Sequence, residues 1–222
     1  MKSPVFNRLL LTCRTLRQEC KCYLCLLIGK IKVLLFFDQR AINKLEIGSA
    51  GSHKNGFISS DLSLQSNYPY DLRAGLPFPD NSIDFIYAEH VLEHFSYRDL
   101  HFLLLECSRV LKQHGALSVS VPNAEIYIRA YSEDGILDRS KFTTYSFGLP
   151  FLTNIDYINH IAYMDDQHKY LFDQDNLLQV LKAAGFQDVK KRDFDGSLDK
   201  ESRRHMSLFA IARKEAHSSD KS

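Results

Sequence analysis

The stretch from Lys44 to Asp61 reads Lys-Leu-Glu-Ile-Gly-Ser-Ala-Gly-Ser-His-Lys-Asn-Gly-Phe-Ile-Ser-Ser-Asp. It predicts a short buried strand, a glycine turn and a second short strand that ends on a carboxylate. Gly48 and Gly51 free the backbone to turn sharply, so that main-chain N–H groups can approach a ligand without interference from a Cβ atom. Asp61 can accept two hydrogen bonds from a ribose diol, as the acidic residue does in nucleotide-binding α/β folds. A Gly-x-x-Gly after an apolar strand is about as often an ordinary tight turn, and both interpretations stay open here.

The chain has 222 residues, enough for one well-buried α/β domain and short for two. Its net charge is +1, so the sequence as a whole gives no electrostatic case for nucleic-acid binding. The charge is unevenly placed, because residues 1–44 hold nine Lys or Arg against Glu19 and Asp38. Residues 1–43 are therefore expected to form a basic, apolar arm on a mildly acidic domain.

The arm is expected to be helical, since its apolar residues recur near 3.6 spacing from Pro4 to Phe37. Lys30 and Lys32 interrupt the apolar run, which is too short to span a bilayer. Two placements are open: the arm packs over the domain core, or residues 1–40 make peripheral contact with a membrane surface. The expected location is cytoplasmic in either case, with or without membrane association.

Four of the five cysteines lie in the arm, at Cys13, Cys20, Cys22 and Cys25. Their spacing suggests a metal site, but no second Cys or His pair follows at zinc-finger spacing. We expect free thiols on a helix in a reducing cytosol, and no metal site in the chain. Lipidation of a membrane-proximal thiol is the remaining alternative.

The rest of the chain alternates strands and helices. Further strands are expected over 83–87, 116–121, 188–194 and 206–213. Ser96 and Asp173 are expected to be helix N-caps, and Gly115 the C′ glycine that ends the first of these helices. Residues 124–170 are the least regular part, and such an aromatic insertion usually caps a pocket or lines a partner surface.

Chemistry-bearing residues recur at the carboxyl ends of the expected strands. They are Gly48, Asp61, Glu89, His90 and Asn123. Open α/β sheets bind ligands in the crevice outside those ends, at the switch in strand order. The arrangement therefore favours a nucleotide-like cofactor.

With these pieces in place, the chain resembles the class I S-adenosylmethionine-dependent methyltransferases. More narrowly, it is similar to small bacterial members of the type 11-like group, in which a short glycine turn joins the first two strands. The matching pieces are Leu45–Gly51, Gly56–Asp61, Leu76–Asp84, His90–His94, Arg109–Lys112 with Gly115, and Leu181–Phe186. They span residues 44 to 213, about three quarters of the chain. Each is loose alone, but their order and spacing are specific.

The resemblance implies an α/β Rossmann-like sandwich with a mixed seven-stranded sheet whose last strand is antiparallel. It also implies a methyltransferase domain over residues 44–214, with 124–170 as a lid over the methyl acceptor. Residues 215–222 are expected to form a frayed tail.

The cofactor implied by the resemblance is S-adenosylmethionine. Its implied binding residues are Glu46, Gly48, Ser49, Ala50, Gly51, Asp61, Leu62, Asp71, Leu72, Glu89 and His90. The turn would wrap the methionine end, Asp61 would hold the ribose hydroxyls, and Asp71 with Leu72 would flank the adenine. Glu89 and His90 would line the sulfonium end. One departure is Ala50, which stands where the family has glycine, so the tightness of cofactor binding is in doubt.

Methyl transfer is an in-line displacement from an activated sulfonium, so much of the rate enhancement can come from positioning the acceptor. A base is needed only if the acceptor must lose a proton. The candidates are His90, His94, His160 and His168, of which His90 is best placed at a strand end. Each has a structural interpretation too, so no catalytic residue is assigned.

The leading hypothesis is methyl transfer to a small-molecule or glycan-type acceptor. No Asn-Pro-Pro-Tyr-like signature stands after the fourth strand, where the chain reads Ala88-Glu89-His90-Val91. The alternative is a catalytically inactive methyltransferase-like protein that docks to a membrane or partner through its basic arm. A nicotinamide oxidoreductase fits only superficially, because Gly-x-Gly-x-x-Gly is missing and only fifteen positions separate Glu46 from Asp61.

Overall fold

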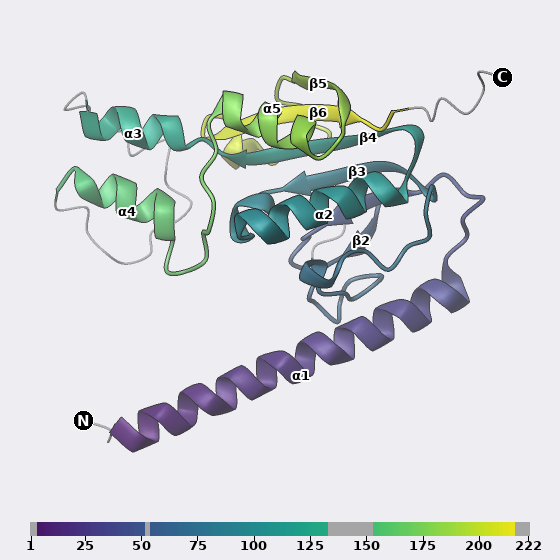
Figure 1. The fold of residues 1–222 in the computed structure, drawn as a ribbon, viewed down its shortest axis with the longest axis horizontal. Helices are drawn as coiled ribbons and strands as arrows, with labels where there is room; N and C mark the ends of the chain where they lie inside the picture. Colours follow the sequence, from purple (N-terminus) through teal and green to yellow (C-terminus); the bar gives the residue numbers. More distant parts are fainter. Residues whose placement is uncertain (1–3, 52–53, 133–152, 216–222) are drawn as a thin grey trace.

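The computed structural model describes residues 4–51, 54–132 and 153–215, with the side chains of the first helix from Thr12 onward. The predictions for residues 133–152 of the lid and 216–222 of the tail lie outside the described residues. Figure 1 shows a twisted sheet flanked by helices, with the long helix α1 (Pro4–Phe36) running beneath the domain. None of the helices in the described part of the chain has the length and apolar character needed to cross a bilayer.

Six strands form one sheet in the order β2-β1-β3-β4-β6-β5. They are β1 (Lys44–Ile47), β2 (Ile58–Ser60), β3 (Ile83–Glu89), β4 (Leu111–Pro122), β5 (Gln187–Lys191) and β6 (Ser207–Arg213). Strand β1 pairs in parallel with β2 and β3, and β3 pairs in parallel with β4. Strand β6 is antiparallel to both β4 and β5. The Rossmann-like mixed sheet with an antiparallel last strand is therefore confirmed.

The described residues give six strands where seven were expected. Between β2 and β3 the chain forms the short 3-10 helix η1 (Leu72–Ala74) in place of a strand. Asp71 caps it by accepting a hydrogen bond from the Arg73 N–H. Proline, which stands at positions 69, 77 and 79, lacks the N–H that a strand ladder needs, and this keeps the segment irregular.

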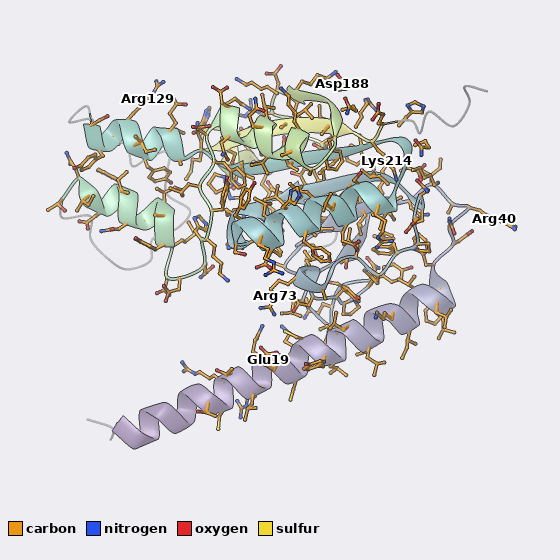
Figure 2. All side chains as sticks on the ribbon, in the orientation of Figure 1. Glu19, Arg40, Arg73, Arg129, Asp188 and Lys214 are labelled. Carbon is orange, nitrogen blue, oxygen red and sulfur yellow. The ribbon has the colours of Figure 1, made fainter. Side chains whose placement is uncertain are left out.

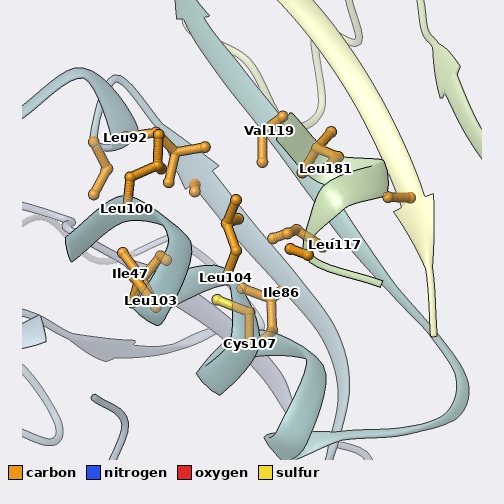
Figure 3. Packing of buried hydrophobic residues seen from close by; sticks show 14 of the residues in the cluster. Ile47, Ile86, Leu92, Leu100, Leu103, Leu104, Cys107, Leu117, Val119 and Leu181 are labelled. Carbon is orange, nitrogen blue, oxygen red and sulfur yellow. The ribbon is translucent and has the colours of Figure 1, made fainter. Parts of the chain in front are cut away.

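Two helices cover one face of the sheet, α2 (Tyr97–Val110) and α5 (Gln174–Ala183). Alternate strand residues point to this face, because side chains alternate along a strand. Figure 3 shows α2 and α5 packing against them through buried side chains, among which are Ile47, Ile86, Leu100, Leu103, Leu104, Cys107, Leu117, Val119 and Leu181. This cluster is the core that holds the strand ends in register.

Both predicted N-caps are confirmed. Ser96 Oγ accepts a hydrogen bond from the Asp99 N–H at 3.3 Å, and Asp173 Oδ1 accepts one from the Asn176 N–H at 2.7 Å. The prediction that Gly115 ends α2 is wrong, since α2 ends at Val110 and Gly115 lies inside β4. A Cβ atom at Gly115 would stand 2.8 Å from the Lys112 carbonyl oxygen and 3.2 Å from the Asp84 carbonyl oxygen, so glycine permits a close backbone approach there.

The opposite face of the sheet is polar and is covered by the segment 192–206. Tyr87 Oη donates to Asp199 Oδ1 at 2.8 Å, and Arg192 Nη1 pairs with Asp199 Oδ2 at 2.6 Å. Arg192 also donates to Ser118 Oγ at 2.8 Å. This face carries Glu46 and Glu89 toward the strand ends, where a ligand site is expected.

Helix α1 packs on the domain through one side. Cys22 and Cys25 are buried, and Gly29 lies so close that a Cβ atom there would meet the Pro69 carbonyl oxygen at 2.2 Å. The side chains on the other side of the helix stay exposed. In the described structure the arm therefore packs over the domain, and the outer side of its helix stays exposed to solvent.

Helices α3 (Ala124–Ser132) and α4 (Ile155–Tyr163) pack on each other beside the sheet, as Figure 1 shows at its left. Their small core contains Tyr127, Tyr157 and Ile161. They are the described part of the expected lid, whose role over an acceptor stays a prediction.

Candidate functional site

The glycine turn after β1 has a backbone that demands glycine. Gly48 has φ = 67°, and a Cβ atom there would stand 2.4 Å from Val91 Cγ2. Gly51 has φ = 80°. Ala50 also has a left-handed backbone, with φ = 52°. The residue that departs from the family pattern therefore adopts the conformation of the glycine it replaces, which costs an L-residue roughly 1–2 kcal/mol.

Asp61 braces this turn from the end of β2. Its Oδ2 accepts hydrogen bonds from Ser49 Oγ at 2.9 Å and from the Gly51 N–H at 3.1 Å. Its Oδ1 accepts one from Ser66 Oγ at 2.6 Å. A ribose hydroxyl bound here would use the second lone pair of Oδ1, because Oδ2 already accepts two hydrogen bonds.

A cavity of about 720 Å³ opens beside the turn. Ten of the eleven predicted cofactor-binding residues line it, and Gly51 is the one that does not. The lining ten are Glu46, Gly48, Ser49, Ala50, Asp61, Leu62, Asp71, Leu72, Glu89 and His90. The residues predicted from the sequence thus lie on one continuous wall of the cavity, although Glu46 and His90 are 44 positions apart.

The same cavity is lined by basic residues that the sequence reasoning missed: Lys21, Arg73, Lys169, Lys200 and Arg203. The Lys200 N–H donates to Glu89 Oε1 at 2.9 Å across 111 positions. Arg203 Nη1 lies 3.7 Å from Glu89 Oε2. In the sequence, Lys200 and Arg203 stand out only as basic residues just before the last strand. Nothing in that pattern indicates that Glu89 is their partner in the fold.

Helix α1 reaches the rim of the cavity next to η1. Arg73 Nη2 lies 2.6 Å from Asp71 Oδ2 and 3.3 Å from Cys22 Sγ, and Figure 2 shows Arg73 between the domain and α1. Burial raises the pKa of Asp71, but the hydrogen bonds from Arg73 outweigh it and the net pKa is lowered. The expected adenine end of the cavity is therefore tied to the arm by an ionised carboxylate.

Glu46 offers a carboxylate oxygen to the cavity. It is buried, and among the described residues no group donates a hydrogen bond to its Oε2. Burial raises its pKa. A buried carboxylate with one oxygen unpaired favours a cationic ligand group, which would supply the missing partner.

His90 sits at the end of β3 with a strained backbone, φ = 54°. Its Nε2 lies 2.7 Å from Ser207 Oγ on β6, and its Nδ1 lies 3.6 Å from Glu93 Oε1. Burial lowers the pKa of His90 well below its usual range, so the ring is neutral at pH 7. A non-glycine residue held at positive φ beside a cavity is the kind of strain that functional sites store.

The other histidine candidates divide into two groups. His94 lines the cavity, and its ring centroid lies 5.3 Å from that of buried His168. Burial raises the pKa of the nearby Glu93 carboxyl to about 8 and lowers the pKa of His168. His160 stands apart in α4, where its ring lies 5.9 Å from that of Tyr127.

The residues present fit S-adenosylmethionine. The cavity volume is within the 300–1,000 Å³ typical of small-ligand pockets. A Cβ atom at position 48 would fill part of the turn that borders it. The carboxylates of Glu46 and Glu89 suit a ligand that carries an ammonium and a sulfonium.

The chain matches known proteins in sequence and in fold. A family model described as "Methyltransferase domain" matches residues 63–119. The ubiquinone/menaquinone biosynthesis C-methyltransferase UbiE of Pseudoalteromonas translucida is 27% identical over 183 residues, which cover 78% of this chain. The aligned part covers 63% of that curated relative's length.

Solved structures share the fold at low sequence identity. A chain of the complex between the Haloferax volcanii Trm112 methyltransferase activator and a methyltransferase has a TM-score of 0.51 at 13% identity, covering 86% of this chain and 89% of its own. A Thermotoga maritima S-adenosylmethionine-dependent methyltransferase has a TM-score of 0.48 at 16% identity, covering 85% and 89%.

The sheet order, the glycine turn and the cavity agree with these matches. The chain therefore has the α/β Rossmann-like methyltransferase fold, residues 63–119 match a methyltransferase domain, and S-adenosylmethionine is the cofactor that these matches indicate.

Proposed function

We propose that this chain transfers a methyl group from S-adenosylmethionine to a small-molecule acceptor. The observation that carries the proposal is the gathering of ten predicted cofactor residues around one cavity beside the glycine turn. The bound cofactor supplies a methyl group on a sulfonium, an already activated donor. The chain then has to orient donor and acceptor in line and keep water out.

Each wall of the cavity has a part in that work. The turn from Gly48 to Gly51 receives the methionine end, with Glu46 as acceptor for its ammonium group. Asp61 holds the ribose, and Asp71 with Leu72 flanks the adenine. Neutral His90 is in place to take a proton from an acceptor that must lose one, through a nitrogen now hydrogen-bonded to Ser207.

The acceptor is proposed by class only. The curated relative is named a ubiquinone/menaquinone biosynthesis C-methyltransferase, which makes a quinone-type ring the first acceptor to test, ahead of a glycan. No nucleic acid is expected, because the domain is acidic overall. An inactive binding protein is not favoured by the comparisons.

The test is product formation with a methyl-deuterated cofactor. The protein is incubated with deuterated S-adenosylmethionine and a small-molecule extract, and products are searched by mass spectrometry for the label. A labelled product that needs the active chain and is lost in Asp61→Ala supports the proposal. Cofactor turnover no faster than in a heat-denatured sample, across quinone and glycan acceptors, contradicts it.

A further inference from the structure

Glu93, His94 and His168 converge from two segments of the chain. Their ligand atoms all lie within 4.8 Å of one another. Two backbone hydrogen bonds hold the segments together, because the Lys169 and Tyr170 N–H groups both donate to the Glu93 carbonyl oxygen, at 2.8 and 3.2 Å. The grouping is thus fixed by the backbone.

Both histidine rings have the same free nitrogen. His94 Nδ1 lies 2.9 Å from the Gln167 carbonyl oxygen, and His168 Nδ1 lies 2.7 Å from the Ile161 carbonyl oxygen. A carbonyl oxygen only accepts, so each Nδ1 carries the proton and each Nε2 has a lone pair. Metal-binding histidines are oriented in this way, by a backbone acceptor on the other ring nitrogen.

The third member is a buried carboxylate that lacks a partner. The Glu93 side chain is 2% exposed, and no other described residue donates a hydrogen bond to either of its oxygens. The nearest recorded nitrogen, His90 Nδ1, is 3.6 Å away, beyond hydrogen-bond distance. A buried carboxylate is rarely left in this state, because desolvation without compensation costs several kcal/mol.

We propose that Glu93, His94 and His168 bind a divalent transition-metal ion. Two imidazole nitrogens and one carboxylate suit Zn²⁺ and its neighbours, whereas Mg²⁺ prefers oxygen ligands alone. At metal–nitrogen distances of about 2.1 Å, ligand atoms around a tetrahedral ion stand about 3.4 Å apart, so side-chain rotations that bring the three atoms closer by up to about 1.4 Å would close the site. This proposal differs from the sequence expectation of no metal site, which considered only the cysteines.

The site would face the proposed methyl-transfer cavity. His94 lines that cavity, and so does Lys169, the residue after His168. Three protein ligands leave a position open for a further oxygen ligand. Resting on the proposed function, the inference is that the ion holds a hydroxyl-bearing acceptor beside the sulfonium end.

Cobalt binding tests the site without any activity assay. Metal-stripped protein is titrated with Co²⁺, whose visible absorption reports nitrogen and oxygen ligation. We expect one equivalent to bind, with affinity at least about 10-fold weaker in Glu93→Gln and His168→Gln. The control His101→Gln removes a histidine of α2 outside the cluster and should bind like the parent chain.

The outcome separates this inference from the function on which it rests. Glu93→Gln keeps the side-chain shape, so it decides the question even if His168→Gln does not fold. Equal Co²⁺ affinity in the parent and Glu93→Gln overturns the site. So does a lack of stoichiometric Co²⁺ binding by protein that binds S-adenosylmethionine in a parallel titration.

A second inference rests on the outer side of α1. Large apolar side chains recur there every three to four residues, opposite the buried Cys22 and Cys25. They include Leu16, Tyr23, Leu27, Ile31 and Leu34, which are 60%, 72%, 60%, 45% and 84% exposed. We call this set the outer stripe. A helix normally buries such a stripe, and the domain does not cover it.

The charges on the helix indicate what covers the outer stripe. Lys30 is exposed beside the stripe and Arg14 and Arg17 elsewhere on the helix, against Glu19, the single acid in the described part of α1, which Figure 2 marks. A second copy would set these cations against one another, whereas anionic lipid would neutralise them. We propose that the outer stripe docks on an anionic membrane surface.

Vesicle sedimentation tests this placement. We expect the full chain to sediment with phosphatidylcholine vesicles that contain phosphatidylglycerol, and at least about 10-fold less in Leu27→Gln combined with Leu34→Gln. The control Leu105→Gln changes a 46% exposed leucine on α2 and should bind like the parent. Equal binding by the double variant overturns the proposal, as does a dimer in light scattering that the double variant abolishes.

Discussion

The buried carboxylates at the cavity and behind it fall into two kinds, which differ in how many hydrogen bonds their own chain gives them. Asp199 accepts four hydrogen bonds and Asp61 accepts three, all from donors of their own chain. Glu46 and Glu93 keep oxygens that no other described residue satisfies. A saturated carboxylate shapes a wall, because its donors are fixed by it. An unsatisfied carboxylate favours protonation or a ligand, since either one removes its desolvation cost.

The largest effect is expected from Asp61→Ala. Three donors, Ser49 Oγ, the Gly51 N–H and Ser66 Oγ, would lose their acceptor and the turn its brace. At about 1 kcal/mol per hydrogen bond, the affinity for S-adenosylmethionine should fall about 100-fold. Equilibrium dialysis measures it, with Asp80→Ala as the control because that carboxylate is 68% exposed. Unchanged affinity would remove Asp61 from the site.

Asp199, on the sheet face behind the cavity, tests how much a fully hydrogen-bonded carboxylate stabilises the fold. Burial raises the pKa of Asp199, but the hydrogen bonds from Arg192, the Asp195 N–H and Tyr87 outweigh it, and the net pKa is lowered. The folded pKa lies below the unfolded one, so this stability is full above about pH 4 and is lost as the pH falls through the folded value.

Asp199→Asn should therefore lower the free energy of unfolding by about 2–3 kcal/mol at pH 7. The difference between parent and variant should narrow below pH 4. Guanidinium unfolding at several pH values measures both. A difference that stays constant down to pH 2.5 would mean that the carboxylate charge does not contribute.

Gly48→Ala tests the turn itself. The added Cβ atom would stand 2.4 Å from Val91 Cγ2, on a backbone with φ = 67°. We expect the free energy of unfolding to fall by about 2 kcal/mol, measured by guanidinium unfolding. Adding Val91→Ala should recover the part due to the clash and not the part due to φ. Full stability in Gly48→Ala would contradict this turn geometry.

The smallest effect is expected from Ala50→Gly. Glycine relieves the strain at φ = 52° but loses more backbone entropy on folding, so the net gain should be at most about 1 kcal/mol. S-adenosylmethionine should bind equally or a few-fold more tightly. Weaker binding would show that the Ala50 methyl group contacts the ligand.

What the sequence predicted well was local. The caps at Ser96 and Asp173 involve side chains three residues from their partners, and the glycine turn is a continuous stretch. The contact of Lys200 with Glu89 spans 111 positions, so no local pattern carried it. Lys21 lines the cavity because α1 packs beneath the domain, which no local sequence pattern indicates.

The errors have physical causes as well. Gly115 was assigned to a helix end because glycine is common there, yet it lies in β4, where a Cβ atom would stand 2.8 Å from the Lys112 carbonyl oxygen. The sequence did not predict that Glu93, His94 and His168 converge, because His168 lies 74 positions beyond His94. The cysteines drew attention as metal ligands because they are close in sequence.

The most direct test of the account is calorimetric titration of S-adenosylmethionine into the purified full chain. If the cavity beside the glycine turn is the cofactor site, we expect saturable binding of one equivalent of S-adenosylmethionine. S-adenosylhomocysteine should displace it, and binding should persist after metal is stripped. A flat titration of folded protein would contradict it, because the glycine turn and its cavity would then have no cofactor to hold.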